Sequence, residues 1–268
     1  MAIVLNDSLR AEYVHLFTTC SVWPGFISAA ENRAGAMVKS RLRYEAATHK
    51  LGVPWYVAAV IHHMESSGNF MRHLHNGDPL TARTTHVPAG RPVDGKPPFL
   101  WEASAADALW FKGLDAQRDW SLPATLYVLE GYNGWGYRQF HPDVLSPYLW
   151  GLSNHHKRGK YVADGTWSQT AETAQLGAAV LLKILAANGT VSFPDAPAST
   201  ERAPPWVPGY RPVDPYRDPE TRRHAIELQK WLSTYLVRAL AIDGVLGPRT
   251  SEAYRLVTGH YLPGDPRA

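Results

Sequence analysis

Two carboxylic acids, Glu65 and Asp78, stand on either side of an abrupt change in sequence pattern. Apolar side chains recur at helical spacing before Glu65, whereas the residues after Gly68 alternate and then reach a turn at 76–79. Two carboxyl groups that flank a sugar linkage, one protonated and one ionised, can cleave a glycosidic bond. This pair is therefore the first candidate for chemistry in the chain.

The expected position of Glu65 suits the protonated partner. It falls at the C-terminus of a helix, whose negative end disfavours ionisation, and Ile61 and Met64 are apolar neighbours. Asp78 falls in a polar turn, where a carboxylate stays ionised. Thr84 follows after five intervening residues and could hold a water molecule. We predict Glu65 as the general acid, Asp78 as the base and Thr84 as the residue that positions water.

These three residues need a helix and a hairpin to hold them. Pro54 suits an early helical position, and the pattern predicts a helix up to residue 67, ended by Gly68. Alternating side chains, the turn and the strand-like residues 81–87 predict a β-hairpin over residues 71–87. A helix followed at once by a hairpin would place both carboxyl groups along one cleft.

Further residues of this stretch are candidates for contact with substrate. We predict that His75 and Arg83 bind the sugar polymer from the hairpin. Residues 88–98 are rich in proline and glycine and predict a loop that walls the cleft.

Histidines crowd the predicted site, namely His62, His63, His73, His75 and His86. His73 and His75 would share one strand face, so a metal site is conceivable. No His-Glu-x-x-His or paired-cysteine spacing is present, and a polar cleft explains the histidines without metal. We therefore predict no metal and no cofactor.

A second motif lies downstream, where Pro123 opens a predicted helix over residues 124–132. Its end carries Tyr132-Asn133-Gly134, followed by Tyr137. Glycine permits close approach of a ligand to the backbone, while asparagine and tyrosine offer hydrogen bonds and stacking. Sugar binding and a glycine-rich turn with core aromatics are equally good interpretations of this motif taken alone.

The composition limits the classes of function. The chain has 268 residues, is 45% hydrophobic and has ten tryptophans and thirteen tyrosines, enough for a core and for sugar stacking. The net charge of +3 suits an anionic wall polymer, and no dense basic block predicts nucleic-acid binding. Cys20, the one cysteine, excludes an internal disulfide and fits folding in a reducing cytoplasm. We expect a monomer.

Neither the first residues nor the most apolar stretch of the sequence predicts a membrane protein. The first residues lack the basic start and apolar core of a signal peptide. The most apolar stretch, residues 176–187, contains Lys183 and is too short to span a bilayer. We expect a soluble protein, made in the cytoplasm and released to the cell wall by another route, such as phage lysis.

The organisation along the chain predicts two domains. Helices are expected from about residue 7, over 28–50, over 101–110 and over 171–187. Residues 1–190 would form the catalytic domain, and the proline-rich residues 191–217 a linker. Residues 218–268 would form a small helical domain.

The order Glu65…Asp78-(five residues)-Thr84 resembles the catalytic set of phage-type lysozymes. Glu65-Ser66 is also similar to the Glu-Ser motif of goose-type lysozymes and lytic transglycosylases, whose sugar-binding Tyr-Asn-Ala-Gly motif resembles Tyr132-Asn133-Gly134. The resemblance implies a mainly α, lysozyme-like α+β fold, with a helical catalytic domain and a short β-hairpin.

The C-terminal segment resembles the three-helix peptidoglycan-binding domain found beside cell-wall hydrolases. The similarity covers about residues 218–262 and centres on Asp-Gly-x-x-Gly-x-x-Thr, which begins at Asp243. By this resemblance Asp243, Gly244 and Arg249 would contact the wall, although the aspartate and glycine first serve the turn.

Together the resemblances imply an N-acetylmuramidase that cleaves the β-1,4 glycan strand of peptidoglycan by acid/base catalysis, with inversion. Three alternatives stay open. A lytic transglycosylase would use Glu65 alone, a non-catalytic wall-binding or virion protein would use neither carboxylate, and chitin or chitosan could replace peptidoglycan as substrate.

Overall fold

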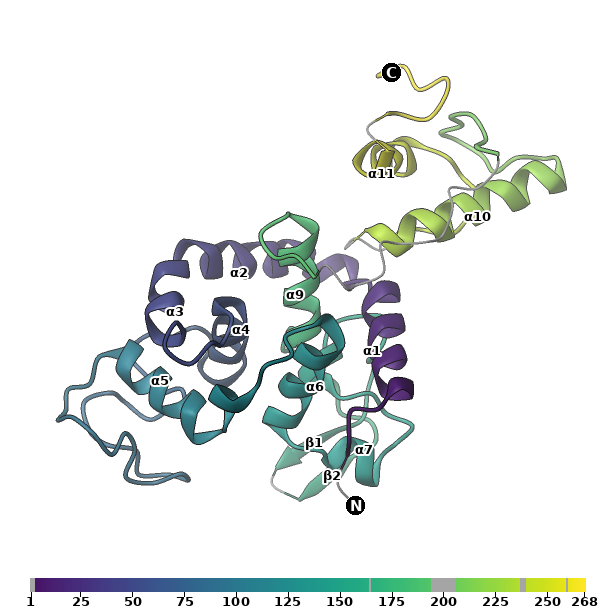
Figure 1. The fold of residues 1–268 in the computed structure, drawn as a ribbon. Helices are drawn as coiled ribbons and strands as arrows, with labels where there is room; N and C mark the ends of the chain where they lie inside the picture. Colours follow the sequence, from purple (N-terminus) through teal and green to yellow (C-terminus); the bar gives the residue numbers. More distant parts are fainter. Residues whose placement is uncertain (1–2, 164, 194–205, 237–239, 259) are drawn as a thin grey trace.

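The computed structural model describes residues 3–163, 165–193, 206–236, 240–258 and 260–268 (Figure 1). Within them the chain is mainly helical, as expected, with one small antiparallel sheet. The helices are α1 (Asp7–Thr19), α2 (Ile27–Lys39), α3 (Arg41–Thr48), α4 (Trp55–Ser66), α5 (Trp101–Phe111), α6 (Leu122–Asn133), α7 (Gly136–Phe140), α8 (Pro147–Trp150), α9 (Ala178–Ala187), α10 (Pro219–Tyr235) and α11 (Pro248–Thr258). The strands are β1 (Lys160–Ala163) and β2 (Thr166–Ser168).

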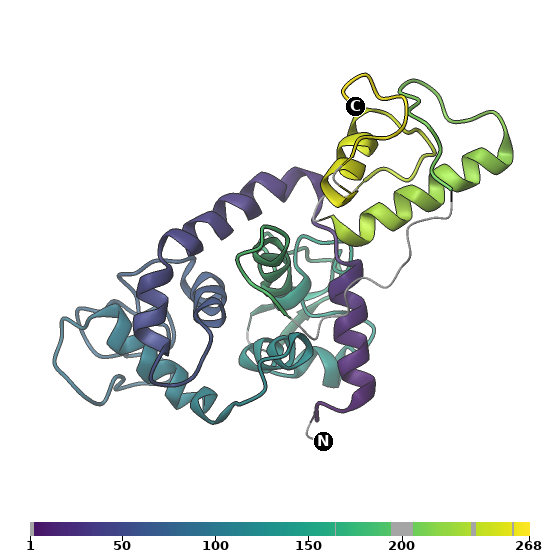
Figure 2. The same cartoon turned by 45° about the horizontal axis from the view of Figure 1, so that its top comes forward.

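Helix α4 is the centre of the larger of two hydrophobic clusters. Its residues 57–61 are fully buried, which is the pattern of a helix enclosed on all sides. Helices α3, α6 and α9 pack around it (Figures 1 and 2). The predicted helix before Glu65 is therefore confirmed, and it is the main structural support of the site.

Aromatic packing fixes the last turns of α4. The His62 ring centre lies 4.5 Å from those of Phe70 and Trp101. Its Nδ1 atom lies 3.0 Å from the hydroxyl of Tyr44 on α3. Because these rings come from before and after α4, they hold the helix end that carries Glu65 against α3 and α5.

The predicted hairpin over residues 71–87 is wrong in its second half. One isolated antiparallel bridge joins Arg72 to Pro79, and residues 81–87 form no strand. Backbone donors of the following loop bond to the side chain of Asp78 instead of to a facing strand. Such local bonds compete with sheet pairing and are invisible to side-chain alternation. The sheet of the described residues is β1–β2, which the sequence analysis did not predict.

Two helices begin or end at other residues than the sequence predicted. The helix expected over 28–50 breaks at Ser40 into α2 and α3, and the apolar spacing continues across the break. The helix expected over 171–187 begins at Ala178. A Cβ on Gly177 would lie 2.1 Å from the backbone oxygen of Leu149, so this close backbone contact requires glycine and sets the start of α9.

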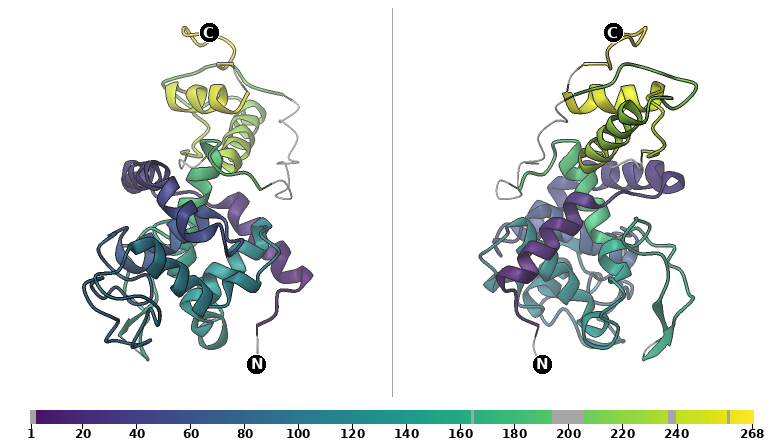
Figure 3. Two further views of the ribbon diagram at one scale, coloured as in Figure 1. Left: turned by 60° about the vertical axis from the view of Figure 1, so that its left-hand side comes forward. Right: turned by 90° about the vertical axis from the view of Figure 1, so that its right-hand side faces the viewer.

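The second hydrophobic cluster lies in the C-terminal part of the chain, on the side of α1 and α2 that faces away from α5 (Figures 1 and 3). Leu228 and Leu232 of α10 pack with Leu246, Ala253 and Leu262. Helices α10 and α11 are the two helices in the described residues beyond 205, where a three-helix unit was expected.

The predicted linker over 191–217 divides between the two clusters. Val191 and Phe193 belong to the larger one, and Val207 and Tyr216 pack against the smaller one. Residues 194–205 lie outside the described residues. None of the described helices combines the length and apolar character that crossing a bilayer requires.

Candidate active site

The end of α4 places Glu65 beside a sharp turn. Ser67 adopts a left-handed conformation with φ of 55°, and Gly68 follows with φ of 74°. The amide of Ser67 donates to the oxygen of His63 and that of Gly68 to the oxygen of His62, so the helix closes cleanly. Glu65 thus projects from the last helical turn, as the sequence predicted.

The Glu65 carboxyl lies among side chains from three other elements. The Tyr148 hydroxyl on α8 donates to its Oε1 atom over 3.0 Å. The buried Tyr132 hydroxyl at the end of α6 has no partner among the described residues. Lys112, just after α5, places its Nζ 4.7 Å from the centre of the Tyr132 ring. We use the name glutamate pocket for this cluster of four side chains, Glu65, Lys112, Tyr132 and Tyr148, and not for a cavity.

The electrostatics of the glutamate pocket favour a protonated Glu65. Burial raises its pKa, against the hydrogen bond from Tyr148 and the charge of Lys112, which lower it. The same burial, with the charge of Glu65, raises the pKa of Tyr132 and of Tyr148. A carboxyl group whose pKa is raised keeps its proton nearer to neutral pH, as a general acid requires.

Asp78 lies in a different environment. Its Oδ2 accepts from the Thr85 amide at 2.7 Å, the Thr85 hydroxyl at 3.3 Å and the His86 amide at 3.0 Å. Its Oδ1 accepts from His86 Nδ1 at 2.6 Å. Burial alone would raise its pKa, but these hydrogen bonds hold it well below the ordinary value. Asp78 is not among the groups that shift the pKa of Glu65.

Thr84 also forms its bonds within the loop. Its hydroxyl donates to the Pro88 oxygen at 2.5 Å and accepts from the Arg91 amide at 2.8 Å. These two contacts close residues 84–91 into a compact turn. Asp78 and Thr84 therefore both form their bonds within this loop, and the contacts of neither side chain reach the glutamate pocket.

His75 and Arg83 hold the same loop in place. His75 Nε2 donates to Asp107 on α5 at 2.8 Å, and Arg91 donates twice to that carboxylate at 2.9 and 2.6 Å. Arg83 donates to the Gly95 oxygen at 2.9 Å. The bonds of Arg91 attach residues 81–98 to α5, and the bond of Arg83 joins two parts of this loop.

Of the downstream motif, Tyr132 alone belongs to the glutamate pocket. Asn133 is exposed, and Gly134 has a φ of 98°, which ends α6. Tyr137 is buried, its hydroxyl accepts from the Tyr161 amide at 3.3 Å, and its ring packs on Trp167 of β2. Tyr137 thus anchors the β1–β2 sheet to α7.

The predicted wall-contact residues lie in a tight turn of the second cluster. Asp243 Oδ1 accepts from the Val245 amide at 2.8 Å and from Gln229 of α10 at 2.9 Å. The Gly244 amide donates to the Gln229 side-chain oxygen at 2.8 Å. Asp243 and Arg249 line a cavity of about 770 Å³. The aspartate and glycine therefore serve the turn first, as the sequence analysis expected.

Sequence reasoning missed Tyr148, Lys112 and Gln175, whose Nε2 donates to the Met64 oxygen at the end of α4. A signal for Tyr148 was available, because Pro147 suits the first position of a helix. No local signal marks Lys112 or Gln175, since only the tertiary fold brings them to α4.

The described residues contain no group of three histidine, cysteine, aspartate or glutamate side chains placed to hold a metal ion. No protein-family model, curated protein or solved structure matches this chain. Any assignment of function therefore depends on the residues of the glutamate pocket.

Proposed function

We propose that this chain is a lysozyme-like enzyme that cleaves the β-1,4 glycan strand of peptidoglycan, with Glu65 as general acid. The observation that carries the proposal is a partly buried glutamate at a helix end with a raised pKa, held by one tyrosine hydroxyl. That arrangement supplies the proton that the departing sugar oxygen needs.

The neighbours of Glu65 each support one part of the proton transfer. The Tyr148 hydroxyl fixes the orientation of one carboxyl oxygen and leaves the other free of partners among the described residues. The positive charge of Lys112 stabilises the carboxylate after the proton has left. The Tyr132 hydroxyl is buried without a partner among the described residues and lies close enough to Glu65 for the carboxylate charge to raise its pKa.

Two products are possible after protonation. In hydrolysis, Asp78 would take a proton from a water held by Thr84, and the anomeric centre would invert. In lytic transglycosylation, the hydroxyl of the substrate itself attacks, Glu65 takes back a proton, and no second carboxylate is needed. The glycan then ends in an anhydro sugar, lighter by one water.

The bonding of Asp78 favours the transglycosylase as the second candidate. Its carboxylate accepts four hydrogen bonds and has a lowered pKa, which makes it a weak base. The Thr84 hydroxyl already has a donor and an acceptor. Both residues are thus accounted for by the loop that they build.

Digestion of purified sacculi followed by mass analysis of the fragment ends tests both candidates. Reducing ends support hydrolysis, and anhydro ends support transglycosylation. The Glu65→Gln variant is the control, because it is nearly isosteric and lacks the acidic proton. Intact sacculi with the wild-type chain would overturn the enzyme proposal and leave a wall-binding or virion role.

A further inference from the structure

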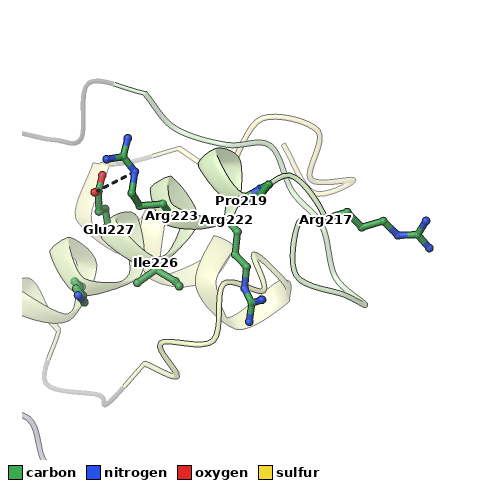
Figure 4. A pocket seen from close by; sticks show the side chains of 7 residues that line it. Arg217, Pro219, Arg222, Arg223, Ile226 and Glu227 are labelled. Atoms are coloured by element: carbon green, nitrogen blue, oxygen red, sulfur yellow. Dashed lines mark ion pairs between the residues drawn. The ribbon is translucent and has the colours of Figure 1, made fainter.

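One face of α10 carries a row of cationic side chains, which we name the α10 basic face. It consists of Arg222, Arg223 and Lys230, extended by Arg217 from the preceding loop. Figure 4 labels the three arginines. The helical members are one, seven and eight residues apart, which places their Cα atoms within an arc of about 100° around α10 at 3.6 residues per turn. They border a shallow cavity of about 340 Å³ together with Ile226 and the acidic Glu227.

The charges of this face are scarcely neutralised. Among the described residues, Arg217, Arg222 and Lys230 form no ion pair, and Arg223 approaches Glu227 at 3.9 Å. Two arginines elsewhere in the C-terminal part of the chain are paired closely, Arg255 with Glu252 at 2.5 Å and Arg267 with Asp265 at 2.7 Å. The basic face thus differs from its surroundings in having excess positive charge.

The placement of the arginines along α10 points in the same direction. Arg222 and Arg223 follow Asp218, the N-terminal cap, by one turn, and the last turn has no basic residue. The positive end of a helix dipole repels cations and attracts anions. Arginines at this end therefore contribute little to the helix and add to its attraction for an anion.

The basic face adjoins the turn that the sequence predicts for wall contact. The Arg222 side chain packs over Gly244, where an added Cβ would lie 3.1 Å from its Cγ atom. Asp243, the neighbour of Gly244, lines the other cavity of this cluster. A polymer bound at the turn could therefore continue along α10.

We propose that the α10 basic face binds phosphate groups of an extended anionic polymer in the bacterial envelope. The proposal rests on the proposed wall-cleaving function, since it names what keeps the enzyme at its substrate. Guanidinium groups match phosphate oxygens in pairs. Figure 4 shows Arg217, Arg222 and Arg223 pointing in separate directions, which suits successive phosphates better than one small anion. Arg222 and Lys230 are about 12 Å apart along the helix axis at about 1.5 Å per residue.

Binding of inorganic polyphosphate to the full chain tests the chemistry directly. We expect Arg222→Gln/Arg223→Gln to weaken binding at least tenfold. Lys157→Gln/Arg158→Gln is the matched control and should bind as the wild type does. It removes two exposed charges that lie outside the C-terminal part of the chain. Equal binding by both double variants would overturn the proposal. So would equally tight binding of polyglutamate, or tighter binding of double-stranded DNA that the arginine variant loses.

The location in the envelope is tested with sacculi and the Glu65→Gln chain, which should bind without cutting. Stripping phosphate polymers from the sacculi with hydrofluoric acid should weaken binding of Glu65→Gln at least tenfold. The same treatment should not change binding when Arg222→Gln/Arg223→Gln is combined with Glu65→Gln. Equal binding to stripped and unstripped sacculi would overturn the proposal. Cleavage of soluble glycans is measured separately, so a failure of the proposed enzyme activity is distinguishable from a failure of phosphate binding.

Discussion

Glu65 and Asp78 are separated by twelve residues, and the fold treats their identical functional groups in opposite ways. Glu65 accepts one hydrogen bond from another part of the chain, and burial raises its pKa. Asp78 accepts four hydrogen bonds from its own loop, which hold its pKa below the ordinary value although little of its surface is exposed.

The difference teaches that burial alone does not prepare a carboxyl group for acid catalysis. Where donors are few, desolvation decides, and the group keeps its proton. Where several donors meet the carboxylate, the ionised form is stabilised even in a buried place, and the group becomes a structural element. The predictions below break or sharpen this contrast.

Replacement of Glu65 by glutamine should have the largest effect. Glutamine cannot protonate the leaving oxygen, so the rate of glycan release should fall by roughly 10²–10⁴. The melting temperature should stay close to that of the wild type, because the amide keeps the shape of the carboxyl. Dye release from labelled sacculi and thermal unfolding measure the two quantities. Full activity of this variant would remove Glu65 from the mechanism.

Replacement of Asp78 by asparagine should act on stability more than on chemistry. The amide NH₂ group would face donors of Thr85 or His86, so we expect a loss of about 1–3 kcal/mol in the free energy of unfolding. Protease cleavage within residues 81–98 should become faster. Asp94→Asn is the control, since Asp94 is exposed on the same loop.

The opposite result for Asp78 has a clear meaning. A stable variant whose rate falls as far as that of Glu65→Gln would identify Asp78 as the base and the reaction as hydrolysis. Anhydro products with a mild loss of rate would assign Asp78 to the loop.

The contrast also shows what the sequence could predict. Helical spacing and the stop at Gly68 located Glu65 at the end of α4, because those signals are local. The side chain of Asp78 bonds to residues 85 and 86 and takes the place of a facing strand. Side-chain alternation does not record such bonds, so the pattern of residues 81–87 wrongly predicted a strand. Lys112 and Tyr148 come to Glu65 only through packing of distant helices, which no local pattern records.

Replacement of Tyr148 by phenylalanine should sharpen the contrast by leaving Glu65 with no hydrogen bond from the described residues. The bond from Tyr148 lowers the pKa of Glu65, so its loss should raise that pKa further. The alkaline limb of the rate profile, where Glu65 loses its proton, should move to higher pH. The maximal rate should fall by less than about tenfold, the equivalent of one hydrogen bond.

Tyr127→Phe is the control for this shift, because the Tyr127 hydroxyl donates to Ile3. Its pH profile should match that of the wild type. An alkaline limb that moves to lower pH in Tyr148→Phe would show that Tyr148 stabilises the protonated form of Glu65 instead.

The smallest effect at neutral pH is expected for His63, a buried residue of α4 one half-turn before Glu65. Burial lowers the pKa of His63 in α4 from 6.5 to about 4, and neither ring nitrogen has a partner among the described residues. The unfolded chain therefore takes up a proton below about pH 6.5 that the folded chain refuses until about pH 4. Stability should fall as the pH drops through this window.

Replacement of His63 by leucine removes that proton uptake and leaves no hydrogen bond broken. The melting temperature at pH 7 should change little, whereas its decline between pH 6.5 and pH 4 should become shallower than in the wild type. His62 has the same lowered pKa of about 4 and keeps part of the decline in place. His49→Leu is the control, since His49 is exposed. Thermal unfolding across the window distinguishes the variants, and an unchanged slope in His63→Leu would show that His63 already carries a proton in the folded chain.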